Sequence, residues 1–150
     1  MNNEIIVGID IGGTSTKFGL VNQQGEVIYQ SKVETQRHEE FGDFINDLFD
    51  AIHQGIAQTA SGATIKGIGL GAPNANYYRG TIEHAANLRW KGVIPVIRIV
   101  QEKLDVPAII TNDANAAAMG EAIYGNAKNM QDFMVITLGT GPVSYTHLRA

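Results

Sequence analysis

The chain has 150 residues, a length that fits one modest domain or part of a larger protein. Hydrophobic residues make up 44% and charged residues 17%, which favours a packed core and excludes a wholly disordered chain. The net charge of −4, with 11 scattered Lys and Arg, argues against a protein that grips nucleic acid, and the lack of cysteine excludes disulfides and thiolate metal sites in this stretch.

The sequence carries no targeting or membrane signal. No apolar run approaches the roughly 20 residues of a membrane span. The first four residues lead into an apolar strand without the basic region of a signal peptide. We therefore expect a soluble cytoplasmic protein that acts on no membrane.

The beginning of the chain is predicted to form three adjacent strands. Residues 5–11 are a β-branched run, typical of a strand buried on both faces. Residues 17–21 give a second strand, and the Asn-Gln-Gln-Gly sequence at 22–25 predicts a hairpin turn into a third strand at 27–33. This third run is the least apolar, so we expect it nearer an edge of the sheet.

After these strands the apolar period changes to that of a helix. Apolar residues recur at the spacing of an amphipathic helix over residues 41–56, and Gly62 ends it. A short buried strand is predicted at 65–70. Residues 71–91 are polar and are predicted to be a loop.

The remaining elements alternate between helix and strand. A second helix is predicted over residues 93–104, with Pro95 tolerated in its first turn. A strand at 107–111 follows, then an Ala-rich helix at 113–124 and a last strand at 132–138.

The resulting order is β-β-β-α-β-α-β-α-β. Three adjacent strands followed by alternating helices and strands predict an α/β fold with a mixed sheet, antiparallel at first and parallel afterwards, with helices on its faces. Residues 142–150 show no clear period, and they resemble a read-through or cloning scar more than the continuation of a fold. The alternative is a frayed native terminus.

The sequence Asp10-Ile11-Gly12-Gly13-Thr14-Ser15-Thr16-Lys17 is the strongest chemical motif. Two glycines let backbone N–H groups approach a phosphate, and Thr14 adds a hydroxyl donor. Lys17 would either add a positive charge or face solvent. Asp10 would repel a phosphate directly, so it suits a Mg²⁺ ion held between carboxylate and phosphate. An ordinary hairpin turn explains the Gly-Gly-Thr sequence equally well.

A second candidate site lies where a strand ends and a helix begins. Asn112 and Asp113 occupy the C-terminal edge of the predicted sheet, where open α/β sheets bind ligands. Asn and Asp are also preferred helix N-caps, which is the simpler explanation for either residue alone. With Asn115, however, two amides flank the carboxylate, and a row of short donors and acceptors suits a polyhydroxylated ligand.

Further candidates lie in the loop at 71–91 and near the end of the chain. Side-chain amides can bridge vicinal hydroxyls and an aromatic face can cover a sugar ring, although a solvated loop anchored by Trp90 explains each residue singly. The loop candidates are Asn74, Asn76, His84, Asn87 and Trp90. A second turn, Gly139-Thr140-Gly141, would place backbone donors on the opposite side of the same phosphate chain.

Together these motifs resemble the ROK family of sugar kinases and repressors, within the actin-like and sugar-kinase ATPase superfamily, and most of all its bacterial glucokinases. They occur in family order with family-like spacing across residues 4–141. The matching segments are Asp10 to Lys17 (Asp-x-Gly-Gly-Thr-x-x-Lys), Gly71-Ala72-Pro73, Asn87-Leu88-Arg89-Trp90, Asn112-Asp113-Ala114-Asn115 and Leu138-Gly139-Thr140-Gly141.

The resemblance implies an actin-like, RNase H-like ATPase lobe within a two-lobed fold, with ATP and sugar in the cleft. Asp113 matches the family's catalytic base, and Asn87 and Asn112 match its sugar-hydroxyl contacts. The family's first phosphate turn corresponds to Asp10, Gly12, Gly13 and Thr14, with Lys17 as a further cofactor contact, and the second turn begins at Gly139, Thr140 and Gly141.

The resemblance also divides the chain. It implies an N-terminal lobe with the sugar site at 1–125, the start of a second lobe at 126–141, and a tail at 142–150 that we expect to be non-native. The family's chain is about twice this length, as two lobes of ordinary size require. Its second lobe carries most of the nucleotide pocket and often a Cys-rich zinc motif. After Gly141 the family usually continues Gly-rich, and this chain departs from that pattern with Pro142-Val143-Ser144.

We therefore expect the N-terminal half of an ATP- and Mg²⁺-dependent hexose kinase, with glucose as its first candidate substrate. The fragment is expected to be inactive alone and the complete parent to be a homo-oligomer. Two alternatives stay open: a kinase for another hexose or amino sugar, and a fragment of a sugar-responsive regulator of the same family. Such regulators carry a helix-turn-helix before the first strand, and only Asn2 and Asn3 separate Met1 from Glu4 here, which favours the kinase.

Overall fold

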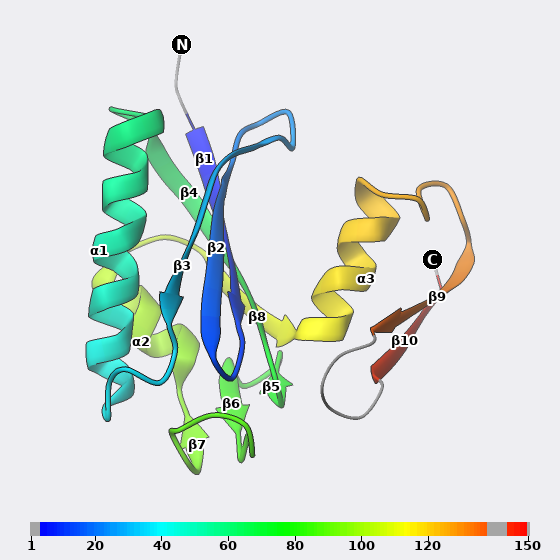
Figure 1. Cartoon of the computed structure of the whole chain (residues 1–150). Helices are drawn as coiled ribbons and strands as arrows, with labels where there is room; N and C mark the ends of the chain where they lie inside the picture. Colours follow the sequence, from blue (N-terminus) through cyan, green and yellow to red (C-terminus); the bar gives the residue numbers. More distant parts are fainter. Residues whose placement is uncertain (1–3, 138–143, 150) are drawn as a thin grey trace.

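A five-stranded mixed sheet in the order β3-β2-β1-β4-β8 forms the centre of the structure, a computed structural model that describes residues 4–137 and 144–149 (Figure 1). β2 pairs antiparallel with both β1 and β3, whereas β4 pairs parallel with both β1 and β8. This confirms the predicted mixed sheet and the edge position of the third strand. The strands are β1 (Glu4–Ile11), β2 (Ser15–Val21), β3 (Val27–Glu34), β4 (Thr64–Ala72) and β8 (Ala108–Asn112).

Helices lie on both faces of this sheet, as predicted. Helices α1 (Phe41–Thr59) and α2 (Val96–Lys103) cover one face, and α3 (Asp113–Ile123) stands on the other side (Figure 1). The core lies under α1 and α2, because their apolar stripes meet one side of every central strand. Fully buried side chains there include Val7, Leu20, Phe44, Leu48 and Val100.

The prediction that the first strand is buried on both faces is wrong. Burial alternates along β1, with Ile5 only 1% exposed and the neighbouring Ile6 44% exposed. Successive side chains of a strand point to opposite faces, and only the face under α1 is fully covered within the described residues. The other face carries Gly8 and Asp10 and is open to a ligand.

The segment predicted as a loop at 71–91 contains part of a small sheet. β5 (Ala75–Asn76), β6 (Thr81–Glu83) and β7 (Val93–Ile94) pair antiparallel in that order. The predicted start of the second helix at residue 93 is also wrong, because Val93 and Ile94 belong to β7 and Pro95 has a non-helical ψ of 69° at the N-cap.

The last described strands lie apart from the main sheet. β9 (Asp132–Thr137) pairs antiparallel with β10 (Ser144–Arg149), beside α3 (Figure 1). The predicted strand at 132–138 is thus confirmed up to residue 137, and residues 144–149 of the tail, whose sequence shows no clear period, form β10. That residues 142–150 are non-native stays a prediction. No helix among the described residues is long and apolar enough to cross a membrane.

Candidate functional site

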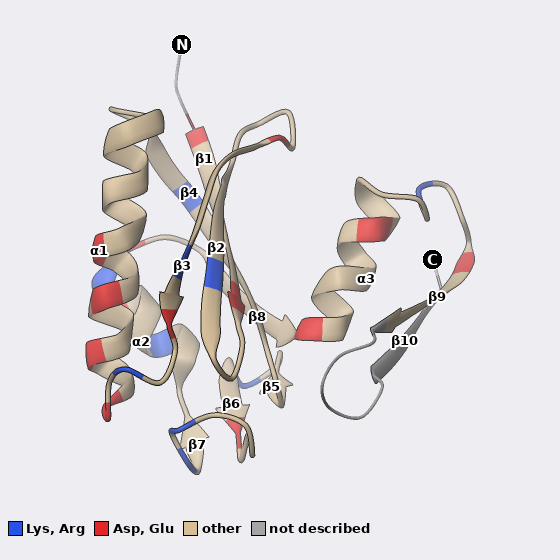
Figure 2. Ribbon diagram, viewed as in Figure 1, with Lys and Arg blue, Asp and Glu red and all other residues tan. Residues whose placement is uncertain are grey.

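A hollow of about 1000 Å³ lies between the open face of the main sheet and α3. Figure 2 shows a basic position on β2 and an acidic position at the start of α3. Both elements contribute residues to the lining of this hollow. Asp10, Lys17, Gly71, Thr111 and Asp113 all line it. The structure therefore brings together residues from both predicted sites, which are about 100 positions apart in the sequence.

Strand register explains this meeting. Asp10 pairs with Lys17 across β1 and β2, with Gly71 across β1 and β4, and Gly71 in turn pairs with Thr111 of β8. Partners in adjacent strands point to the same face of a sheet. Asp10 and Lys17 are both exposed on the open face, so Lys17 faces the hollow.

Asp113 is placed by the junction of β8 and α3. Asn112 is the N-cap of α3, and its side-chain oxygen accepts the Ala114 N–H at 3.0 Å, as the capping interpretation predicted. The same N–H is also donated to Asp113 Oδ1 at 2.8 Å. One oxygen of the Asp113 carboxylate is therefore held by the helix terminus, while its side chain is exposed to the hollow.

The charges in the hollow act on one another. The pKa of Asp10 is raised above its ordinary value, mainly because surrounding protein atoms partly desolvate this side chain, although it is still open to solvent, and this disfavours its charged form. The negative charge of Asp113 raises it further, and Lys17 acts in the opposite direction. Two carboxylates close enough to repel each other offer oxygen ligands to a cation.

The glycine turn is tight at both of its glycines. A Cβ on Gly12 would lie 2.8 Å from the Ser15 carbonyl oxygen, and a Cβ on Gly13 would lie 2.9 Å from the Asn87 carbonyl oxygen. The first contact is internal to the turn and fits the ordinary hairpin interpretation. The second shows that the loop carrying Asn87 lies directly against the turn, so the predicted phosphate and sugar residues are neighbours.

The loop at 84–92 presents Asn87 outward. Leu88 and Trp90 are buried, whereas Asn87 and Arg89 between them are exposed. Trp90 packs on Phe41 with ring centroids 5.0 Å apart. The anchor interpretation of Trp90 is therefore confirmed, and its ring is not available to cover a sugar.

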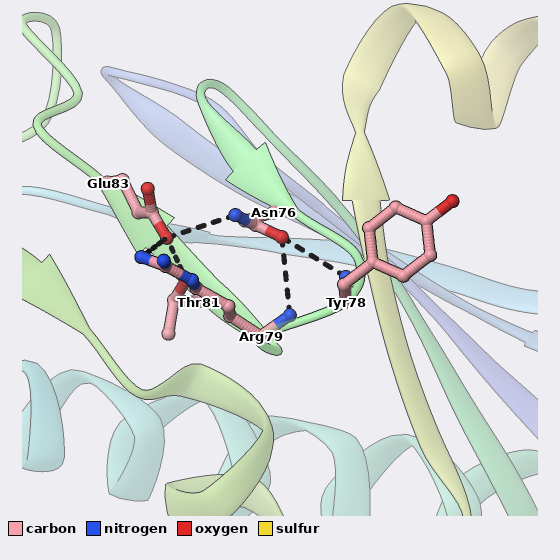
Figure 3. A network of polar contacts seen from close by, with 5 residues as sticks. All are labelled: Asn76, Tyr78, Arg79, Thr81 and Glu83. Atoms are coloured by element: carbon pink, nitrogen blue, oxygen red, sulfur yellow. Dashed lines mark hydrogen bonds and ion pairs between the residues drawn. The ribbon is translucent and has the colours of Figure 1, made fainter.

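Two other candidates in the loop have structural roles. The Asn76 amide donates to Glu83 Oε1 at 3.2 Å, and its oxygen accepts the N–H groups of Tyr78 and Arg79 (Figure 3). Asn74 has a positive φ of 51° and donates to the His84 carbonyl oxygen at 3.3 Å. These contacts shape the β5–β6 hairpin.

Two carboxylates among the described residues could hold a magnesium ion together with a nucleotide. Asp10 and Asp113 face the hollow, although no group of three or more His, Asp and Glu gathers within the described ranges. Mg²⁺ is commonly held by one or two carboxylates together with phosphate oxygens, so this pair fits. Gly139, Thr140 and Gly141, the predicted second phosphate turn, lie outside the described residues.

Sequence reasoning missed two residues at this site. The Gln36 side chain donates to the Gly13 carbonyl oxygen of the glycine turn, and Arg89 donates to the backbone carbonyl oxygen of Gln36. No spacing or composition marks such contacts, because a backbone carbonyl is present at every position.

Comparisons with known proteins agree on one family. A sequence model described as the ROK family matches residues 6–142. A glucokinase of Streptomyces coelicolor is 34% identical over 138 residues, which is 91% of this chain and 41% of that protein. A xylose repressor of Caldicellulosiruptor bescii is 36% identical over 140 residues, which is 91% of this chain and 34% of that protein.

A solved structure supports the same relation. The crystal structure of a ROK family glucokinase from Streptomyces griseus, in complex with glucose and AMPPNP, matches with a TM-score of 0.76 and 31% identity. The match covers 97% of this chain and 44% of that one. The chain therefore spans less than half the length of these relatives.

Proposed function

The chain belongs to the ROK family, and from that premise we propose that it is the sugar-binding half of an ATP-dependent hexose kinase, with glucose as its substrate. Its mixed α/β fold is that of the actin-like ATPase structures of this family. The proposal assigns residues 1–125 to the N-terminal lobe and 126–141 to the start of the second lobe. It includes a cytoplasmic location, where ATP and hexoses meet.

The placement of Asp113 carries this proposal. Its carboxylate faces the hollow, and the Ala114 N–H fixes one of its oxygens. In the proposed reaction, Asp113 accepts the proton of the sugar's primary hydroxyl while that oxygen attacks the γ-phosphorus. Proton acceptance of this kind typically contributes about 10²–10⁴-fold in rate.

The other residues would hold the two substrates. Asn87 and the NH₂ group of Asn112 would bind sugar hydroxyls. Mg²⁺, when bound, neutralises phosphate charge, which is a large part of what phosphoryl transfer needs. The nucleotide and metal contacts would come from Asp10, Gly12, Gly13, Thr14 and Lys17, with Gly139, Thr140 and Gly141 on the opposite side. The complex of the Streptomyces griseus relative with glucose and AMPPNP supports this pair of ligands.

One observation favours a second candidate function. The xylose repressor relative is 36% identical to this chain, so the same hollow could serve a sugar-responsive regulator. A regulator needs to bind a sugar without transferring phosphate to it. A kinase for another hexose or an amino sugar is the nearer alternative, because the sugar contacts of one lobe do not fix the epimer.

The test uses the full-length protein that contains this chain. ADP release is measured with glucose, mannose and an N-acetylated amino sugar, and sugar binding is measured by calorimetry. Asp113→Asn should lower kcat with glucose by at least about 10²-fold while glucose affinity changes much less. Asp50→Asn, at an exposed position on α1 across the sheet, is the matched control and should leave kcat unchanged.

The outcomes separate the candidates. Sugar binding without ADP release from the unaltered protein would favour the regulator. Faster turnover with another sugar would replace glucose. A nearly unchanged kcat in the Asp113 variant would remove Asp113 from the mechanism.

A further inference from the structure

Residues 35–39, which form most of the connection between β3 and α1, link the glycine turn to the loop that carries Asn87. We call them the linking segment. The turn at residues 12–14 and the loop at 84–92 already meet at Gly13 and Asn87, where backbone atoms are too close for a Cβ. The linking segment touches both of them through side chains and backbone.

One end of the linking segment is fixed in the core. Thr35 and Thr16 are both fully buried, and their hydroxyl oxygens lie 2.8 Å apart in a hydrogen bond. The Thr35 N–H also donates to the Thr14 carbonyl oxygen at 3.0 Å. The segment therefore leaves the sheet from a rigid point directly behind the glycine turn.

The other end reaches across to the loop. Gln36 Nε2 donates to the Gly13 carbonyl oxygen at 2.7 Å, and the Gln36 carbonyl oxygen accepts from Arg89 Nη1 at 2.9 Å. Arg89 Nη2 also donates to Glu39 Oε1 at 2.8 Å. A continuous chain of hydrogen bonds thus runs from Gly13 through Gln36 to Arg89, two residues beyond Asn87.

These bonds are poorly placed to stabilise the fold. Gln36 is exposed, and the side chains of Arg89 and Glu39 are 41% and 84% exposed. Exposed ion pairs and hydrogen bonds contribute little to the free energy of unfolding. Geometry is more sensitive, because a displacement of about 1 Å between reacting groups can lower a rate by about 10²-fold.

We propose that Gln36 and Arg89 are positioning residues, which hold the phosphate-binding turn and the sugar-binding loop at one fixed separation. The inference rests on the proposed kinase function for its effect on rate. The proposal gives neither residue a direct contact with a substrate. Gln36 acts through the Gly13 carbonyl group, and Arg89 acts through Gln36 and through the loop that presents Asn87.

The test compares isosteric and shortened variants in the full-length protein. Gln36→Glu keeps the shape of the side chain but cannot donate to the Gly13 carbonyl oxygen. Its matched control is Gln23→Glu, because Gln23 Nε2 also makes one exposed hydrogen bond, to Glu4 at 2.9 Å, and neither residue lines the hollow. For Arg89→Ala the matched control is Arg98→Ala, which breaks the exposed pair of Arg98 with Glu102 on α2.

We expect Gln36→Glu and Arg89→Ala each to lower kcat by about tenfold or more, while the unfolding midpoint stays close to that of the matched control. Arg89→Lys, which keeps the charge but loses the forked donor, should recover part of the rate. Because the two residues act in one chain of bonds, the double variant should be little worse than either single variant. Turnover within twofold of the unaltered protein, an equal loss in the controls, or additive losses would overturn the proposal.

A second measurement does not depend on catalysis. Hydrogen–deuterium exchange of the full-length protein should become faster at residues 12–16 and 86–90 in Arg89→Ala and Gln36→Glu, and should stay unchanged in the controls. If the unaltered protein shows no sugar-dependent turnover, the proposed function fails and this measurement alone decides the positioning role. Unchanged exchange in both segments would refute it.

Discussion

Replacing Asp10 with asparagine should stabilise the 150-residue chain at neutral pH and remove the proposed phosphotransferase activity of the full-length protein. The pKa of Asp10 is raised, first by partial burial and then by the charge of Asp113, against the opposing effect of Lys17. A raised pKa means that the native state binds the proton more tightly than the unfolded chain. The free energy of unfolding therefore falls as pH rises through the native pKa, and the ionised carboxylate destabilises the fold above it.

The size of the gain follows from the exposure of the group. Because Asp10 is partly open to solvent, its interactions are screened, and its charge is worth at most about 1 kcal/mol. Relief of that amount raises the melting temperature by up to about 4 °C in a chain of this size. Asparagine keeps the shape of the side chain, so packing contributes little to the difference.

Thermal unfolding followed by circular dichroism checks the sign at two pH values. At neutral pH, Asp10→Asn should melt above the unaltered chain, with Asp50→Asn as the control. Below the ordinary carboxyl pKa of 3.8, Asp10 is protonated in both states and the difference should vanish. A variant that is less stable at neutral pH, or a gain that persists in acid, would refute this reasoning.

Three further predictions concern the site and the chain. Asn87→Ala in the full-length protein should raise the KM for glucose by about tenfold, because a sugar hydroxyl that is buried on binding loses its hydrogen-bond partner. A change in the KM for ATP instead would show that this loop does not bind the sugar. Gly13→Ala should lower kcat, since the added Cβ would lie 2.9 Å from the Asn87 carbonyl oxygen. Gly42→Ala is the control, because a Cβ there has no neighbouring atom within 4 Å, and it should leave kcat unchanged. Equal kcat values for the two variants would contradict this argument. The 150-residue chain should release no ADP with glucose. It should oligomerise through its exposed strand β9, and a chain that ends near Asn129 should associate less. Glucose-dependent turnover by a monomer of 150 residues would contradict both expectations.

Most of the main sheet could be predicted because apolar periodicity reports it directly. The error at β1 was avoidable in physical terms. Its odd positions are all isoleucine or valine, whereas its even positions include Gly8 and Asp10, an alternation that indicates one open face. β-branched composition alone does not distinguish a strand with one buried face from a strand with two.

The small sheet could not be predicted in the same way. β5 and β7 have two residues each, which is too short for the two-residue alternation of a strand to repeat. Their pairing depends on contacts across the chain, such as Ile82 with Ile94. Pro95 was compatible with a first helical turn, and only its ψ angle shows that the helix begins after it.

The candidate site shows why structural and functional interpretations of one residue need not compete. Asn112 caps α3 through its side-chain oxygen, as the simpler interpretation required, and capping does not use the two donors of its NH₂ group. Gly13 is required by the approach of Asn87, and that same approach brings the turn against the loop that carries Asn87. In both cases the contact that stabilises the local structure also holds one candidate residue beside another, Asn112 beside Asp113 at the start of α3 and Gly13 beside Asn87. Substitutions there should therefore be judged by rate and affinity as well as by stability, because a variant that keeps the fold can still lose the geometry.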